Sequence, residues 1–204
     1  INRLFRTLIY QRAKKVNATT PFGTQLNVYN EGYEWMSHSI YAVNHADSHN
    51  QLRVIVGGES CTKPYSASVL NISSMSFGSL SKNAIRALNT GAKIGGFAHN
   101  TGEGGISPYH LEPGGDLIWQ IGTGYFGCRK MEGEFCPDTY KKNAMLDNVK
   151  MIEIKISQGA KPGHGGILPA IKNTEEIAKI RNVEPFTAVL SPPGHTAFSD
   201  PEGL

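Results

Sequence analysis

Residues 116–166 read DLIWQIGTGYFGCRKMEGEFCPDTYKKNAMLDNVKMIEIKISQGAKPGHGG and alternate between strand and helix patterns. Residues 116–124 are apolar and end in a glycine-rich loop, and residues 151–157 alternate apolar with polar side chains as a half-buried strand does. Residues 136–150 between them predict a helix. Because a helix separates the two strands, we expect parallel pairing through a right-handed crossover.

The same alternation continues on both sides of this unit. We expect further strands at residues 66–77, 97–101 and 186–193, and further helices at residues 79–96 and 167–182. An open doubly wound sheet and a closed barrel both satisfy this order of elements. The order therefore predicts an α/β protein with parallel strands and leaves the two architectures open.

The two outer helices have recognisable ends and apolar residues. Ser79 or Ser81 can cap the free amides at the start of the first helix, and Gly95 with Gly96 ends it. In the first helix Ile85, Leu88 and Ala92 are expected to face inward. The apolar residues of the second helix are Ile171, Ile177, Ala178 and Ile180.

Polar or glycine-rich loops follow the carboxyl ends of the expected strands. They read SSMSFGS, HNTGEGG, QIGTGYFG, ISQGAKPGHGG and LSPPGH, and barrel enzymes place their chemistry at this position. No GxGxxG motif opens a helix with an acidic partner about 20 residues on, which argues against a Rossmann site. The loops favour a barrel, and 204 residues fall short of the roughly 250 that a complete one needs.

Composition excludes several classes of function. The net charge is +3, and lysine and arginine are interleaved with acidic residues, so the chain lacks a basic stripe for nucleic acid. The sequence contains no run of 18 apolar residues, so it does not predict a membrane-spanning helix. Cys61, Cys128 and Cys136 are odd in number and lack metal-ligand spacing, which predicts a reducing, cytoplasmic location and no metal site.

A change of pattern near residue 60 predicts the domain boundary. Residues 1–60 read as an irregular extension that begins with a basic helix at residues 1–15, and residues 61–204 carry the alternating elements. Three histidines of the extension have no carboxylate pattern beside them, so we expect surface or hydrogen-bonded side chains rather than metal ligands. They are His38, His45 and His49.

Four motifs carry a family resemblance. They are SSMSFGSLS at 73–81, NTGEGG at 100–105, QGAKPGHGG with LPA at 158–170, and LSPP at 190–193. Together they resemble the FMN-binding domain of glutamate synthase over residues 70–204, and TTPFGTQ and EGYEWM upstream look like the stand-alone glutamate synthase-like proteins. The resemblance implies the first half, about four β/α units, of a TIM-type (β/α)8 barrel that is truncated at its C-terminus.

The resemblance also implies an activity. Glutamate synthases are FMN oxidoreductases that act on CH–NH2 donors in glutamate biosynthesis, and hydride passes from flavin N5 to a 2-imino acid formed from 2-oxoglutarate and ammonia. The implied partners are the 2-oxo or amino acid, the remainder of the barrel, and an electron-donor or amidotransferase subunit. The resemblance allows an iron–sulfur cluster in the full-length protein, but none of the three cysteines matches its ligand positions.

The first motif is expected to lie against the flavin ring. Ser74, Ser76 and Gly78 are small enough for close approach of the backbone to a ligand. Met75 offers an apolar surface. A flavin also needs a cation near N1 and O2, where negative charge accumulates on reduction.

Lys155 could supply that cation. The alternation of residues 151–157 puts Glu153 and Lys155 on one side of the strand, so an internal ion pair between them is the alternative. Gln120 matches a family glutamine whose amide could hydrogen-bond the flavin, and packing against a loop backbone is its alternative.

Three charged residues carry over from the family as substrate residues. Glu103 and Lys161 are the expected catalytic residues, and Arg181 joins them in binding the 2-oxo or imino acid. Lysine and arginine suit a dicarboxylate, and a glutamate can position ammonia or an iminium. A solvated arginine at a helix end is the alternative for Arg181, and an exposed carboxylate is the alternative for Glu103.

Two departures from the family pattern affect the substrate. Ile167 stands where the family has a glutamine that binds substrate. His164 stands where the family usually has an acidic residue, and a loop-surface histidine is the alternative for it. A hydrocarbon cannot hydrogen-bond a carboxylate, and leaving such a group unpaired costs roughly 1–3 kcal/mol. We therefore expect an N-alkylated or less polar 2-amino acid to be accommodated more easily than 2-oxoglutarate.

Two rival functions remain open. One is a catalytically inactive barrel subunit or scaffold, and the other is an FMN oxidoreductase for a different 2-oxo or amino acid. Because the family's phosphate-binding loops follow strands 7 and 8, we expect residues 1–204 alone to bind FMN weakly and to be inactive.

Overall fold

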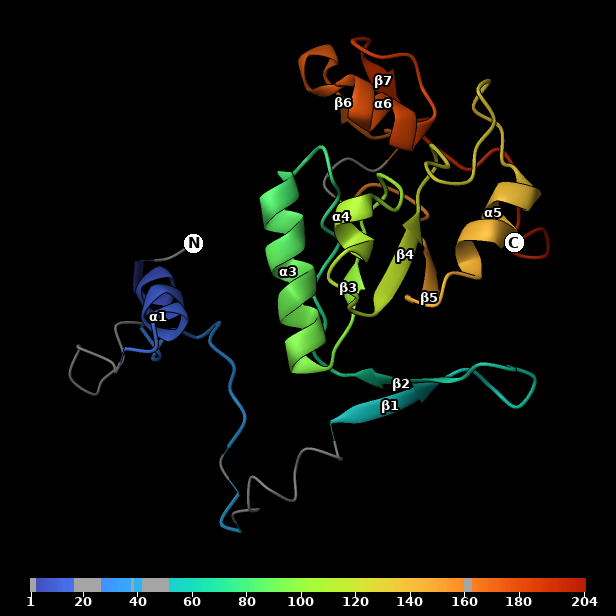
Figure 1. The fold of residues 1–204 in the computed structure, drawn as a ribbon. Helices are drawn as coiled ribbons and strands as arrows, with labels where there is room; N and C mark the ends of the chain where they lie inside the picture. The colour runs from blue at the N-terminus through green and yellow to red at the C-terminus, as the bar shows by residue number, and fades with distance from the viewer. Residues whose placement is uncertain (1–2, 17–26, 38, 42–51, 160–162) are drawn as a thin grey trace. The chain divides into compact units, whose positions relative to one another are not determined.

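The computed structural model describes residues 3–16, 27–37, 39–41, 52–159 and 163–204. The chain divides into two compact units, residues 1–44 and 45–204. The first contains helix α1, Arg3–Ala13, which confirms the expected N-terminal helix (Figure 1). The three histidines considered as metal ligands, His38, His45 and His49, lie outside the described residues.

A parallel sheet lies at the centre of the second unit. It contains β3 (His99–Asn100), β4 (Leu117–Ile121) and β5 (Val149–Ile154) in that order, and both pairings are parallel. Helix α5, Pro137–Ala144, connects β4 to β5. The βαβ unit predicted for residues 116–166 is thus confirmed.

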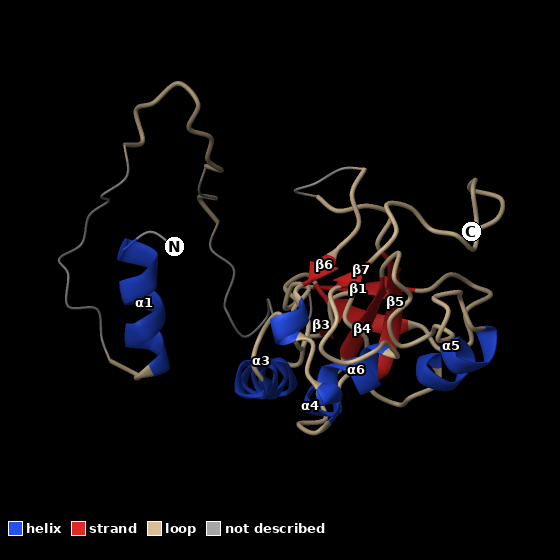
Figure 2. Cartoon of the chain, turned by 90° about the horizontal axis from the view of Figure 1, so that it is seen from above, coloured by secondary structure: helices blue, strands red, loops and turns tan. Residues whose placement is uncertain are grey.

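Helix α3, Lys82–Gly95, precedes the sheet and has the expected ends. The Oγ of Ser81 accepts a hydrogen bond from the backbone N–H of Ala84 at 3.3 Å, and Gly96 ends the helix in the left-handed conformation with φ 66°. Figure 2 shows α3, α4 (Pro108–Leu111) and α5 along the same side of the sheet. Helix α4 was not predicted, because four residues are too few for a helical period.

The prediction of a strand at residues 66–77 is wrong for most of that range. Strand β1, Arg53–Val56, pairs antiparallel with β2, Tyr65–Ser68, so a hairpin strand lies within the extension expected at residues 1–60. The chain then leaves the ladder because the side chain of Asn71 bonds both Ser68 O and the N–H of Ala98. It returns to the parallel sheet only at Ile72, which bridges His99.

The C-terminal segment also differs from expectation. The helix predicted at residues 167–182 is replaced by β6 (Ile167–Leu168), a 3-10 turn η2 (Ala170–Lys172) and α6 (Glu175–Arg181). Thr174 caps α6, since its side chain accepts from the N–H of Ile177.

This rearrangement changes burial and pairing. Ile171 precedes the helix and is 91% exposed, whereas Ile177 and Ala178 are buried. Strand β7, Val189–Leu190, pairs with β6. The pairing is antiparallel, so the parallel prediction is wrong here.

Two apolar clusters stabilise the second unit. The first cluster packs side chains of α3 and α6 against β6, β7 and the loops that contain Phe77 and Phe126. The second cluster lies between β4 and α5. Their buried members are Phe77, Ile85, Phe126, Leu168, Ile177 and Val189 in the first, and Trp119, Ile121, Tyr125 and Cys128 in the second. The fold is therefore α/β with a parallel sheet that is compatible with part of a barrel. Within the described ranges, no helix is long and apolar enough to cross a membrane.

Candidate functional site

The loops that leave β3, β4 and β5 emerge at one edge of the parallel sheet, where the 73–81 segment joins them. The backbone N–H of Met75 donates to Asn100 O at 3.1 Å, and Gln120 Nε2 donates to Ser74 Oγ at 2.9 Å. Because parallel strands end at the same edge, residues far apart in sequence meet there.

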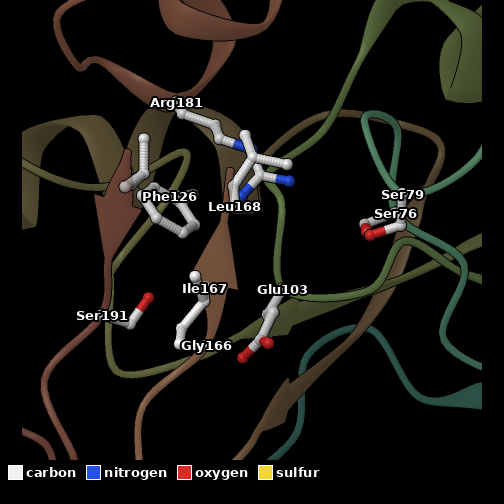
Figure 3. A pocket seen from close by; sticks show the side chains of 10 residues that line it. Ser76, Ser79, Glu103, Phe126, Gly166, Ile167, Leu168, Arg181 and Ser191 are labelled. Atoms are coloured by element: carbon white, nitrogen blue, oxygen red, sulfur yellow. The ribbon is translucent and has the colours of Figure 1, made fainter. Parts of the chain in front are cut away.

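A cavity of about 60 Å³ opens between these loops and the β6–α6 segment. Arg181 enters it from one side and Glu103 from the opposite side, with Ser76 and Ser79 at a third edge (Figure 3). The structure therefore brings together Glu103 and Arg181, which the sequence predicted as substrate residues. The remaining lining residues are Phe126, Gly166, Ile167, Leu168, Val189 and Ser191. Lys161, the third predicted residue, lies outside the described residues.

Arg181 is buried at the end of α6, with 6% of its surface exposed, so it is not a solvated helix-end arginine. Its Nη2 donates a long hydrogen bond of 3.4 Å to Phe77 O, and its guanidinium lies 4.9 Å from the centre of the Phe126 ring. The Nε finds no hydrogen-bond partner among the described residues. Burial lowers the pKa of Arg181, and the nearby Glu103 carboxylate opposes that shift. The cavity wall thus includes a buried guanidinium whose hydrogen-bonding capacity is only partly used by the described residues.

Glu103 is held by two side chains that follow β5 in the sequence. Lys155 Nζ lies 3.3 Å from Glu103 Oε1, and Gln158 Nε2 donates to both carboxylate oxygens at 2.9 Å. The Oε1 of Gln158 accepts from Lys155 Nζ at 2.8 Å. The three side chains form a closed network, and Lys155 pairs with Glu103 rather than with Glu153.

A second network joins Gln120, Asn100 and Glu153 at the sheet edge. Gln120 Nε2 donates to Glu153 Oε1 as well as to Ser74, and Asn100 Nδ2 donates to the same Glu153 oxygen at 3.0 Å. The Oε1 of Gln120 is buried and accepts no hydrogen bond from any described residue. Gln120 therefore contacts the 73–81 segment and retains one free acceptor.

Glycine is required where the Glu103 loop crosses the 73–81 segment. Gly102 has φ +64°, and a Cβ there would lie 2.8 Å from the backbone N of Ser76. A Cβ on Gly104 would lie 3.0 Å from Arg181 Nη2 and from Ser76 Cβ. The glycines on either side of Glu103 thus allow this loop to approach both Ser76 and Arg181.

The other expected flavin residues are divided between the core and the cavity. Met75 is partly buried and packs against the first cluster, and its carbonyl contacts His110 Nε2 at 3.1 Å. Ser76 Oγ donates to Ser79 Oγ at 2.9 Å. Gly78 has φ +102° and lies beside Arg181. Ser76 therefore lines the cavity, whereas the Met75 side chain packs against the apolar core and does not line it.

The two departures from the family pattern occupy different surroundings. Ile167, in β6, lines the cavity and is 63% exposed, so its side chain is available to a molecule bound there. His164 is exposed and is not part of the cavity lining. Only the change at residue 167 therefore alters the chemistry of the cavity wall.

Gln158 is the one residue of the Glu103 network that the sequence did not predict. It is the first residue of the QGAKPGHGG motif, which follows a predicted strand. Its partner Glu103 lies 55 positions away, and no local periodicity reports such a contact.

Comparison with known proteins assigns the chain to a family. The family model described as the conserved region in glutamate synthase matches residues 13–204. The chain belongs to the glutamate synthase family. Its motifs at residues 73–81 and 100–105, which form two walls of the cavity, lie inside the matched region.

Three relatives in the glutamate synthase family illustrate the similarity. The glutamate synthase large subunit-like protein YerD of Bacillus subtilis is 45% identical over 149 residues, which are 72% of this chain and 28% of YerD. An archaeal-type glutamate synthase [NADPH] of Thermotoga maritima is 40% identical over 126 residues, 61% of this chain and 22% of that protein. The glutamate synthase [NADPH] large chain of Azospirillum brasilense is 38% identical over 127 residues, which are 59% of this chain and 8% of that protein. The chain thus spans less than a third of the length of each of these relatives.

Proposed function

We propose that the complete protein is an FMN-dependent, glutamate synthase-type oxidoreductase that reduces a 2-imino acid, and that this chain forms the N-terminal half of its (β/α)8 barrel. The observation that carries this proposal is the meeting of Glu103 and Arg181 at one cavity. The parallel order β3, β4, β5 with loops at one edge supports the barrel.

The cavity residues suit a 2-oxo or imino acid. The guanidinium of Arg181, whose Nε has no hydrogen-bond partner among the described residues, lies beside Phe126. A guanidinium binds carboxylates through two parallel hydrogen bonds. Glu103, held by Lys155 and Gln158, is a negative charge that attracts ammonia or an iminium nitrogen. Lys161 is the second cation that we propose for the substrate's carboxylates.

The sheet edge offers groups that fit a flavin ring. Gln120 keeps a buried Oε1 acceptor without a partner in the described part of the chain, which suits a ring N–H. Ser74, Ser76 and Gly78 leave room for close approach, and the ammonium of Lys155 suits the negative charge of a reduced ring. A reduced flavin supplies the hydride from its N5.

The names of two relatives suggest the electron source. The Thermotoga maritima and Azospirillum brasilense proteins are both named for NADPH. We therefore propose NADPH as the ultimate donor, acting through another part of the protein or an electron-donor subunit. An amidotransferase subunit is the proposed ammonia source, and the cytoplasm is the proposed location.

The colour of the complete protein tests this function. We expect the purified protein to absorb in the flavin bands and to bleach anaerobically when it is given its amino-acid donor or, together with its electron-donor subunit, NADPH. A colourless protein that gains no colour on addition of FMN would leave the scaffold as the better explanation. A yellow protein that bleaches with neither of these donors, but with another reductant, would favour a different FMN oxidoreductase.

Ile167 provides a test of substrate preference. Replacing Ile167 by glutamine adds a hydrogen-bond donor to the cavity wall, and we expect kcat/KM for 2-oxoglutarate to improve by the equivalent of about 1–3 kcal/mol. Ile171→Gln is the matched control, because Ile171 is 91% exposed and does not line the cavity. Equal kinetics for both variants would show that residue 167 does not select the acid.

A further inference from the structure

Cys128 and Cys136 face each other across a short antiparallel turn in the β4–α5 connection. Arg129 bridges Phe135 in antiparallel register, and the N–H of Cys136 donates to Cys128 O at 2.9 Å. The N–H of Lys130 donates to Glu134 O at 2.8 Å on the other side of the bridge. The two cysteines are therefore the next directly opposed pair of the ladder.

Directly opposed residues have a geometry that suits a disulfide. In a hydrogen-bonded antiparallel pair the Cα atoms lie about 5.5 Å apart and the side chains leave the same face. Disulfides join Cα atoms that are roughly 4.4–6.8 Å apart. The backbone on both sides is already fixed, because Asn143 Nδ2 of α5 donates to Gly127 O at 2.6 Å. The backbone register of Cys128 and Cys136 is thus one that a disulfide can span.

The two thiols are free and lie in contrasting surroundings. Cys136 is partly exposed at the start of α5, where the Thr139 hydroxyl donates to its Sγ at 3.3 Å and lowers its pKa. Cys128 is fully buried beside Trp119 and Tyr125, and burial raises the pKa of its thiol to about 12. Cys136 is therefore the thiol that an oxidant meets first.

We propose that Cys128 and Cys136 are an oxidative modification site at which a peroxide converts the two thiols into an intramolecular disulfide. The Cys136 thiolate attacks one peroxide oxygen, the O–O bond breaks, and a sulfenic acid and hydroxide form. The sulfur of Cys128 then attacks the sulfenic sulfur, its proton leaves with the departing hydroxyl as water, and the S–S bond forms. The two sulfurs lose two electrons in all, and the peroxide is reduced to water.

The site adjoins the cavity without being part of it. Phe126, whose ring lies under Arg181, precedes Cys128 by two residues and lines the cavity. A disulfide would fasten this segment to the start of α5. The inference rests on the backbone register and the surroundings of the thiols, so it does not depend on the function proposed above.

Tryptic mapping of the complete protein provides the test. Arg129 and Lys130 lie between the two cysteines, so trypsin places Cys128 and Cys136 on separate peptides unless a disulfide joins them. After treatment with hydrogen peroxide, blocking with a maleimide in denaturant, which makes the buried Cys128 accessible, and digestion without reductant, we expect one linked species that separates into both peptides on reduction. Recovery of both peptides as maleimide adducts after peroxide would overturn the proposal.

Three serine variants separate this site from general thiol oxidation. Cys61→Ser is the matched control, because Cys61 is exposed and free, and it should keep the linked species. Cys136→Ser should lose it, with Cys128 recovered as a maleimide adduct. Cys128→Ser should leave Cys136 as a sulfenic acid that dimedone traps. Linkage of either cysteine to Cys61 as the main product would contradict the proposed pairing. Because Cys136 is partly exposed, the Cys136→Ser variant tests the pairing even if the Cys128→Ser variant does not fold.

Discussion

Replacement of Glu103 by glutamine in the complete protein is expected to lower kcat by about 100-fold or more. The carboxylate accepts from Gln158 at both oxygens and forms an ion pair with Lys155. A glutamine keeps the shape but offers one acceptor oxygen, and its NH2 group meets donors. The variant therefore loses the negative charge that would hold ammonia or an iminium nitrogen, and it also disturbs the position of Lys155.

Steady-state kinetics and thermal unfolding together check this prediction. The matched control is Glu112→Gln, since Glu112 forms an exposed ion pair with Arg86 at 2.7 Å and exposed pairs contribute little to stability. We expect the control to keep both its kcat and its melting temperature. Unchanged turnover of every amino and 2-oxo acid by Glu103→Gln would remove Glu103 from the catalytic residues.

The parallel sheet could be predicted because its signals are local. Residues 116–124 and 151–157 carry strand patterns with a helix between them, and β4 and β5 formed where those patterns lie. The strand expected at residues 66–77 failed for a different reason. The side chain of Asn71 takes two backbone hydrogen bonds, and apolar residues such as Leu70 then remain exposed.

The C-terminal helix shows how capping overrides apolar spacing. Residues 167–182 contain isoleucines that fit a helical period, yet Thr174 caps a shorter helix that begins at Glu175. Pro169 and the β6–β7 pairing keep residues 167–169 extended, and Ala170–Lys172 form only a 3-10 turn. As a result, Ile167 lies in strand β6 and lines the cavity. The helical pattern of the sequence did not indicate this position.

The partner of Lys155 illustrates the limit of strand alternation. Alternation placed Lys155 and Glu153 on one side of the strand, but residues two apart on a strand are separated by about 6–7 Å. Neighbouring chain segments offer closer partners. Glu153 accordingly bonds Gln120 and Asn100, and Lys155 bonds Glu103 and Gln158. Which segments adjoin is a property of the folded topology, so only the family resemblance could indicate the site.

Replacement of Arg181 by methionine is expected to raise KM for the 2-oxo acid by about 150-fold, the equivalent of about 3 kcal/mol. The reason is the loss of a desolvated cation that faces the cavity. The free energy of unfolding should change by less than about 1 kcal/mol, because methionine fills the space and removes a buried charge whose Nε has no partner in the described residues.

Arg129 supplies a control for the loss of ring contact alone. Its guanidinium lies 5.5 Å from the centre of the same Phe126 ring, and its Nη1 donates to Gly124 O at 3.2 Å, but it does not line the cavity. Arg129→Met should therefore leave KM near that of the unchanged protein. If both variants raised KM equally, the effect would come from packing around Phe126. A rise confined to Arg181→Met, with stability unchanged, would support substrate binding by the guanidinium.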